Sequence, residues 1–242
     1  MKHRVCIALD VDDVPAALLL VKVLGSLSPI FKVGSHLFAS GEGRKIIDEI
    51  HGTGAKVFLD LKFHDIPNTV ANAARVATRM GVSMFNVHSL GGFDMMRAVA
   101  DAVGEESEKT GTDKPLVIAI TVLTSMSQGD LRHDLLVNES LDSYVVHLAC
   151  LTKKSGLDGV VCSPQEIQAI KQACGTNFVV VTPGIRPEWS LERHDQKRVL
   201  TAKQAFEMGA DYIVVGRPII HAASPMGALN RLMAEINAEQ DE

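Results

Sequence analysis

Short apolar runs rich in β-branched residues alternate along the chain with segments of helical periodicity. Most of the runs are continuously apolar, which is typical of parallel strands covered on both faces. We predict strands at Val5–Asp10, Ile30–Gly34, Lys56–Lys62, Met84–Ser89, Leu116–Leu123, Gly159–Ser163, Phe178–Pro183 and Tyr212–Arg217. We predict helices at Val14–Leu24, Gly43–His51, Val70–Met80, Gly92–Val103, Ser140–Lys154, Pro164–Ala173, Thr201–Met208 and Pro225–Ala238.

This alternation predicts an α/β protein with a single (β/α)₈ TIM barrel over residues 1–242. The competing fold is a doubly wound open sheet, which usually carries a G-x-G-x-x-G turn after its first strand. Here that position reads Asp10-Val11-Asp12-Asp13. The chain is long enough for two small domains, but it shows neither a linker nor a repeat, so we expect one domain.

The third predicted strand changes from apolar to charged at its end. Val57, Phe58 and Leu59 are followed by Asp60 and Lys62, and alternation along a regular strand puts these two charges on one face. Opposite charges on the inner face of an apolar strand are costly to desolvate unless a site needs them. A surface ion pair at a strand end is the alternative interpretation.

Other polar residues stand at the predicted strand ends, where barrels carry their chemistry. Lys32 interrupts an apolar strand just as Lys62 does, although a lysine in such a place can also extend to water. The nearness of Lys32 to Asp60 and Lys62 in the predicted topology favours a charge network. For Asn86 alone, we expect a strand-end polar residue that meets solvent.

The loops after the seventh and eighth strands suggest a phosphate site, because barrels of this type often bind phosphate there. Each loop supplies a glycine and an arginine, in Pro183-Gly184-Ile185-Arg186-Pro187 and in Gly216-Arg217-Pro218-Ile219. Glycine allows close backbone approach, and arginine can bind phosphate oxygens through two hydrogen bonds. Ordinary turns with solvated arginines are the alternative.

Composition and charge argue against several classes of function. The formal net charge of −5 argues against nucleic acid as a partner, since nonspecific binding needs a basic face. No apolar stretch approaches the length of a membrane span or of a signal-peptide core. The four cysteines lack CxxC spacing and the histidines lack a metal-binding pattern, so we expect no metal, no disulfide and a cytoplasmic location.

These motifs together resemble the orotidine 5′-phosphate decarboxylase family. The resemblance rests on Asp60-x-Lys62-x-x-Asp65-Ile66-Pro67-Asn68-Thr69, on the two glycine–arginine loops, and on Val122-Leu123-Thr124-Ser125-Met126. It runs along the whole chain and is closest to the free-standing bacterial type. It implies decarboxylation of orotidine 5′-monophosphate to uridine 5′-monophosphate, the last step of de novo pyrimidine synthesis, without metal or cofactor.

The resemblance also implies a homodimer with two sites at its interface. Lys32, Asp60 and Lys62 would belong to one subunit's site, and Asp65 and Thr69 would reach the partner's site. In the implied chemistry, the Lys62 ammonium offsets the charge that develops at C6 and then donates a proton to it. The implied substrate-binding residues are Asp10, Lys32, Asp60, Thr69, Thr124, Arg186, Gln196, Gly216 and Arg217.

Two other functions remain open. Sugar-phosphate decarboxylases and aldolases related to this family share an Asp-x-Lys-x-x-Asp strand but use Mg²⁺; the continuation Ile66–Thr69 favours the nucleotide enzyme. A phosphate-ligand sensor that has lost catalysis is the second, and the intact set of Lys32, Asp60, Lys62 and Asp65 argues against it.

Overall fold

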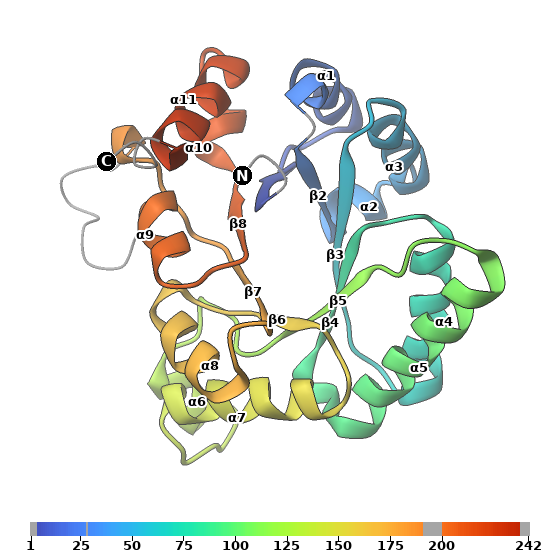
Figure 1. Ribbon diagram of the computed structural model, residues 1–242, viewed down its shortest axis with the longest axis vertical. Helices are drawn as coiled ribbons and strands as arrows, with labels where there is room; N and C mark the ends of the chain where they lie inside the picture. The colour runs from blue at the N-terminus through green and yellow to red at the C-terminus, as the bar shows by residue number, and fades with distance from the viewer. Residues whose placement is uncertain (1–3, 28, 191–199, 238–242) are drawn as a thin grey trace.

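Parallel strands close into a barrel in the computed structural model, which describes residues 4–27, 29–190 and 200–237. The order around the barrel follows the sequence from β1 to β8, and β1 pairs with β8 to close it (Figure 1). The strands are β1 (Val5–Ala8), β2 (Ile30–Gly34), β3 (Lys56–Phe63), β4 (Met84–His88), β5 (Leu116–Ile120), β6 (Gly159–Val161), β7 (Val179–Thr182) and β8 (Tyr212–Val215). This is the single (β/α)₈ barrel that the alternation predicts.

Helices surround the barrel on its outside, and the last helix packs beside the first (Figure 1). The helices are α1 (Val14–Leu24), α2 (Ser35–Ala39), α3 (Gly43–Gly52), α4 (Pro67–Arg79), α5 (Gly92–Thr110), α6 (Gln128–His133), α7 (Leu141–Lys154), α8 (Ile167–Cys174), α9 (Ala202–Glu207), α10 (Arg217–Ile220) and α11 (Pro225–Asn237). Within the described part of the chain, none of them is both long and apolar enough to cross a bilayer.

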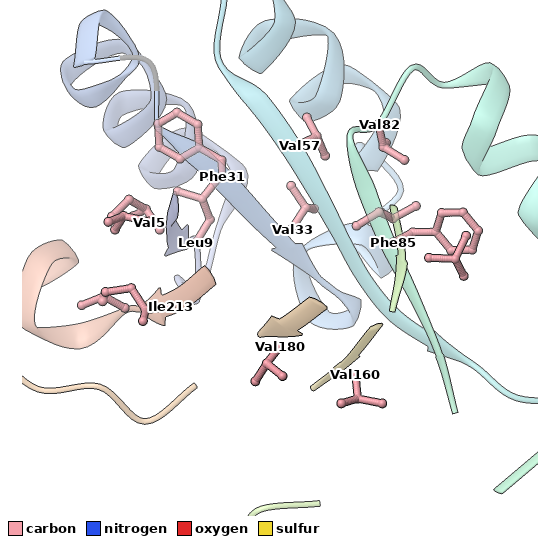
Figure 2. Packing of buried hydrophobic residues seen from close by; sticks show 14 of the residues in the cluster. Val5, Leu9, Phe31, Val33, Val57, Val82, Phe85, Val160, Val180 and Ile213 are labelled. Carbon is pink, nitrogen blue, oxygen red and sulfur yellow. The ribbon is translucent and has the colours of Figure 1, made fainter. Parts of the chain in front are cut away.

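The strands separate two apolar layers. The larger layer lies between strands and helices and includes Phe31, Val57 and Phe85 (Figure 2). The smaller one fills the barrel and is made of Cys6, Ala8, Ile30, Phe58, Met84, Ile118, Val181 and Val214. Because side chains alternate along a strand, the next inward positions after Ala8, Ile30 and Phe58 are Asp10, Lys32 and Asp60. The apolar filling therefore gives way to charged groups at the carboxyl end of the barrel.

The eight strands fall where the sequence predicts them, whereas some helix boundaries differ. Helix α4 begins at Pro67 instead of Val70, because proline at the first helical position lacks only an N–H that the helix does not use. The predicted helix from Pro164 opens as a 3₁₀ turn, Pro164–Glu166, before α8. The sequence did not predict the short helices α2, α6 and α10, which are too brief to show a clear period.

The last residue of that 3₁₀ turn is a buried acid, Glu166. Glu166 accepts a hydrogen bond from the Ser163 backbone N–H at 2.8 Å, and the Ser163 side chain caps the turn in return. Burial raises the pKa of Glu166 to about 7; the Ser163 N–H opposes this shift, and the charge of Asp142 adds to it. The fold therefore favours the protonated carboxyl of Glu166. The contribution of this group to folding stability is fully present below the ordinary pKa of a glutamate and is lost as the pH rises through about 7.

We expect Glu166→Gln to raise thermal stability at pH 8 and to leave it nearly unchanged at pH 5. The amide keeps an acceptor for Ser163 but carries no charge to bury, so the gain is on the order of 1 kcal/mol, or roughly 2–4 °C in Tm. Thermal unfolding followed by circular dichroism at both pH values measures it. The control is Glu139→Gln at an exposed position, and an equal gain at the two pH values would contradict the assignment.

Candidate functional site

A cavity of about 510 Å³ opens at the carboxyl ends of the strands, a volume suited to a small-molecule ligand. Most of the residues that the sequence singled out lie around it. They are Asp10, Lys32, Asp60, Lys62, Thr124, Arg186, Gly216 and Arg217. Gln196 lies outside the described residues. The cavity floor is apolar, with Ala8, Phe58, Ile120 and Val214 from inside the barrel.

One side of the cavity carries a row of alternating charges. The Lys32 ammonium lies 3.1 Å from Asp10 Oδ1 and 3.1 Å from Asp60 Oδ2. The Lys62 ammonium lies 2.6 Å from the other Asp60 oxygen, Oδ1. Lys32 and Asp60 are only 8% and 9% exposed, whereas Lys62 and Asp10 are open to solvent. The alternative of a surface ion pair is therefore wrong for Asp60, and Lys32 does not extend to water.

The row keeps its two buried members charged. Burial alone would lower the pKa of Lys32, but the carboxylates of Asp60 and Asp10 outweigh burial and raise it. Burial alone would raise the pKa of Asp60, but Lys32, Lys62 and the Asn86 amide together lower it. Each buried ion is thus stabilised by its neighbours, which is the condition for holding charge in a site of low polarity.

The backbone at Lys62 departs from regular strand geometry. Its φ is +52°, a left-handed value that costs a non-glycine residue of order 1–3 kcal/mol. Between the pairs Leu59–Phe85 and Phe63–Val87, three residues of β3 lie opposite the single residue Asn86 of β4. The side chains of Asp60 and Lys62 do meet, as alternation suggested, but a bulge and not a regular strand brings Lys62 there.

Asn86 corrects a prediction made from sequence. We expected a strand-end side chain in solvent, but Asn86 is completely buried. Its Nδ2 donates to Asp60 Oδ1 at 2.6 Å, and its Oδ1 accepts from the Lys62 backbone N–H at 2.8 Å. Sequence reasoning missed this role because the bulge that places Lys62 opposite Asn86 has no signature in the strand pattern. A polar residue at an inward position of an apolar strand was the available signal.

A second unexpected pair lies beside the row. The rings of His64 and His88 stack with centroids 5.3 Å apart. Burial, followed by the charges of His64 and Lys62, lowers the pKa of His88 to about 4. Its Nδ1 accepts a hydrogen bond from the Leu90 N–H at 3.3 Å. Neutral His88 therefore joins the end of β4 to the segment that carries Asp65.

Asp65 and Thr69 lie on the outer rim. Both are exposed, and neither is among the described residues that line the cavity. Asp65 Oδ1 accepts a hydrogen bond from the Ile66 N–H at 2.6 Å. The segment also exposes Ile66, which is 67% accessible; Leu90, just before α5, and Phe93, in its first turn, are partly exposed as well. Within one chain, the structure does not bring Asp65 to Lys62.

The two glycine–arginine loops also border the cavity. Gly184, Arg186, Gly216 and Arg217 all line it, and Gly184 has a φ of +77°, which glycine adopts without strain. A side chain on Gly216 would contact Ala8 and approach Asp10, so the backbone there runs close to the floor. The two arginines thus add cationic groups to the lining of a cavity that also holds the row of alternating charges.

The fold and the site define a (β/α)₈ barrel with a charged ligand-binding cavity at the carboxyl ends of its strands. Residues 3–232 match the model of the orotidine 5′-phosphate decarboxylase / HUMPS family. The chain therefore belongs to this family.

Curated relatives support the same assignment. The chain is 51% identical to orotidine 5′-phosphate decarboxylase of Syntrophomonas wolfei, over 97% of this chain and 98% of the relative. It is 46% identical to the Moorella thermoacetica protein of the same name, over 97% and 92%. The crystal structure of orotidine 5′-phosphate decarboxylase from Lactobacillus acidophilus superposes with a TM-score of 0.85 at 37% identity, covering 97% of this chain and 99% of that one.

We expect Asp60→Ala to destabilise the fold by about 3 kcal/mol, because it leaves the buried Lys32 with only one of its two carboxylate partners. Urea unfolding at pH 7 measures the change. The matched control is Asp48→Ala, which breaks an exposed i,i+4 pair with Arg44 and should cost less than about 0.5 kcal/mol. Equal losses for the two variants would contradict the picture of a buried charge row.

Proposed function

We propose that this protein is a cofactor-free enzyme that decarboxylates orotidine 5′-monophosphate to uridine 5′-monophosphate, the last step of de novo pyrimidine synthesis. The observation that carries the proposal is the row from Asp10 through Lys32 and Asp60 to Lys62, which ends in the cavity. Both the family match and the names of the curated relatives support it. We expect the enzyme to act in the cytoplasm.

The residues that line the cavity fit the parts of a nucleotide. Arg186 and Arg217, with the backbone at Gly216, would bind the 5′-phosphate, and Gln196 would join them. Asp10 and Lys32 would bind the ribose hydroxyls, since both line the cavity and Asp10 lies close to the backbone of Gly216. Thr124, which lines the cavity after β5, would lie beside the pyrimidine. The apolar floor would hold the face of the base.

Lys62 would then carry the chemistry. Loss of CO₂ from C6 leaves an electron pair in an sp² orbital that the pyrimidine ring delocalises poorly. The Lys62 ammonium would offset this charge and donate the proton that replaces CO₂, so that the bond from C6 to carbon becomes a bond from C6 to hydrogen. At about 4 Å and an effective dielectric constant near 20, one such pairing is worth about 4 kcal/mol.

One lysine does not supply the whole effect, because enzymes lower barriers by roughly 8–23 kcal/mol. Asp60 lies beside Lys62 and would face the substrate carboxylate, whose departure relieves the repulsion between the two anions. Lys32 holds Asp60 in place from the other side. Contacts to the distant phosphate would contribute binding energy to this alignment.

Asp60 supports a reaction without a metal, since its oxygens already have partners. Oδ1 accepts from both Lys62 and Asn86, and Oδ2 pairs with Lys32. A divalent ion at Asp60 would have to displace an ammonium group. The Mg²⁺-dependent sugar-phosphate enzymes of the same family are the second candidate function, and turnover of a ketose phosphate that depends on Mg²⁺ would favour them.

We further propose that the active form is a homodimer in which Asp65 and Thr69 complete the partner's site. Two observations support this. Asp65 is exposed and forms no ion pair with Lys62 of its own chain, and the apolar residues Ile66, Leu90 and Phe93 are exposed as well. Apolar side chains gathered beside a charged rim are typical of a protein–protein interface.

Pure protein incubated with orotidine 5′-monophosphate and EDTA should form uridine 5′-monophosphate. The reaction is followed by the fall in the absorbance of the orotate ring. We expect Lys62→Ala to lower kcat by at least about 10³-fold while the fold is retained, since the variant loses both the electrostatic contact and the proton donor. Circular dichroism serves as the folding control. Tight nucleotide binding with no product from the wild type would instead support a sensor.

The shared site can be tested by mixing two inactive variants, Asp65→Ala and Lys62→Ala. Each hybrid dimer would contain one site with both native residues, so random exchange should restore up to about a quarter of wild-type activity. Native mass spectrometry reports whether subunits have exchanged. Exchange without recovered activity would count against a site shared between subunits.

A further inference from the structure

Asn86 joins the two residues on which the proposed reaction depends, and it does so from a different strand. We propose that Asn86 is a positioning residue: its amide holds Lys62 in its left-handed backbone conformation and fixes the Asp60 carboxylate beside the Lys62 ammonium. This inference rests on the proposed function for its kinetic consequences, but the geometry of the bulge stands independently of the substrate.

The first part of the argument concerns the backbone of Lys62. The bulge in β3 removes Lys62 from the regular pairing with β4, so its N–H lacks the usual ladder partner. Asn86 Oδ1 takes that place at 2.8 Å. A buried N–H left without an acceptor costs about 1–3 kcal/mol, which is comparable to the strain of the left-handed φ. The Asn86 side chain therefore offsets the strain that the bulge creates.

The second part concerns the Asp60 carboxylate. Asp60 Oδ1 accepts from Asn86 Nδ2 at 2.6 Å and from Lys62 Nζ at 2.6 Å. The amide thus contacts both the main chain of Lys62 and the carboxylate that holds its ammonium. A rotation of the Asn86 backbone or a shift of β4 would move both groups together.

The orientation of the amide is determined by these contacts. If its oxygen and nitrogen were exchanged, the oxygen would face the Asp60 carboxylate and the NH₂ group would face the Lys62 N–H. Both contacts would then be repulsive, so only one orientation is compatible with the site. An asparagine at this position supplies one acceptor and one donor, and no aliphatic or hydroxyl side chain of similar size supplies both in that geometry.

Position 86 is rigid as well as buried. Asn86 is completely inaccessible, and its neighbours on β4 pair with Val117 and Ala119 of β5 at Phe85 and Val87. A group mounted on a central strand positions its partners more precisely than one on a loop. Because a displacement of about 1 Å at a reacting group can cost roughly 100-fold in rate, this rigidity bears on kcat.

The charged groups around position 86 allow a specific test. The charged ones are Asp60 and Lys62 from β3 and Lys32 from β2; neutral His88 from β4, stacked on His64, is a further titratable group. In Asn86→Asp, the introduced carboxyl can still accept from the Lys62 N–H, but it can donate to Asp60 only when protonated. Two carboxyl groups at hydrogen-bond distance share one proton, and their apparent pKa rises.

The experiment compares kcat and KM of the wild type, Asn86→Ala and Asn86→Asp from pH 5.5 to 8.5. For Asn86→Ala we expect kcat to fall by roughly 100-fold at every pH, with KM changed by less than about threefold, because the phosphate contacts are intact. For Asn86→Asp we expect a similar loss of kcat at pH 8. At pH 6 we expect the ratio of its kcat to the wild-type kcat to be at least about tenfold higher than at pH 8.

Ser89→Ala is the matched control, since it removes a buried hydrogen bond to the Ile120 carbonyl just beyond β4 and leaves Asp60 and Lys62 untouched. We expect kcat within about twofold of wild type. The inference is overturned if Asn86→Ala keeps kcat within about threefold, or if Asn86→Asp follows the pH dependence of the wild type.

A crystal structure of Asn86→Ala tests the geometry without any assay. We expect Lys62 to leave the left-handed region and its ammonium to move away from Asp60 Oδ1; an unchanged Lys62 would overturn the inference. If the wild type itself shows no turnover, the proposed function fails while this structural test still decides the role of Asn86. If Asn86→Ala does not fold, the pH profile of Asn86→Asp decides it.

Discussion

The site depends on one buried carboxylate with a cation on each side. Asp60 is 9% exposed and lies 3.1 Å from the Lys32 ammonium and 2.6 Å from the Lys62 ammonium. A buried charge is tolerated only when it is paired and hydrogen-bonded. Asp60 meets this requirement with both oxygens, and in doing so it holds in place the lysine that faces the cavity.

The barrel limits how much these buried charges destabilise the fold. Its interior is apolar up to the layer of Phe58 and Met84, and its outer face is packed against helices. Charges therefore enter only at the last inward positions, where one end of the barrel opens to solvent. Pairing sets Lys32 level with Ala8 and Phe58, and Asp60 level with Gly34 two residues further along β2. The long Lys32 side chain therefore extends toward the carboxyl end of the barrel to meet Asp10 and Asp60.

The bulge in β3 links the charge row to the rim. It turns Lys62 toward Asp60, and the chain that leaves it carries His64, Asp65 and exposed Ile66 outward. The same few residues thus end β3 and begin the surface that we propose for the partner subunit. His88, kept neutral by a pKa of about 4, packs His64 against the end of β4 without adding a charge there.

Much of this protein could be inferred from the sequence. Continuous apolar strands between amphipathic helices predicted the barrel, and charges that interrupt those strands at Lys32, Asp60 and Lys62 predicted the charge network at one end of it. Such signals are local: each depends on the period of a strand or helix and on the cost of burying a charge. The position of Gln196 stays a prediction, since it lies outside the described residues.

The role of Asn86 and the left-handed backbone at Lys62 were decided only by the tertiary structure. A bulge depends on how two strands are paired, and pairing is a property of neighbours that are distant in sequence. No pattern within β4 distinguishes an asparagine that meets solvent from one that replaces a missing ladder bond. The sequence determined which charges enter the barrel, and the pairing of β3 with β4 decided how they are held.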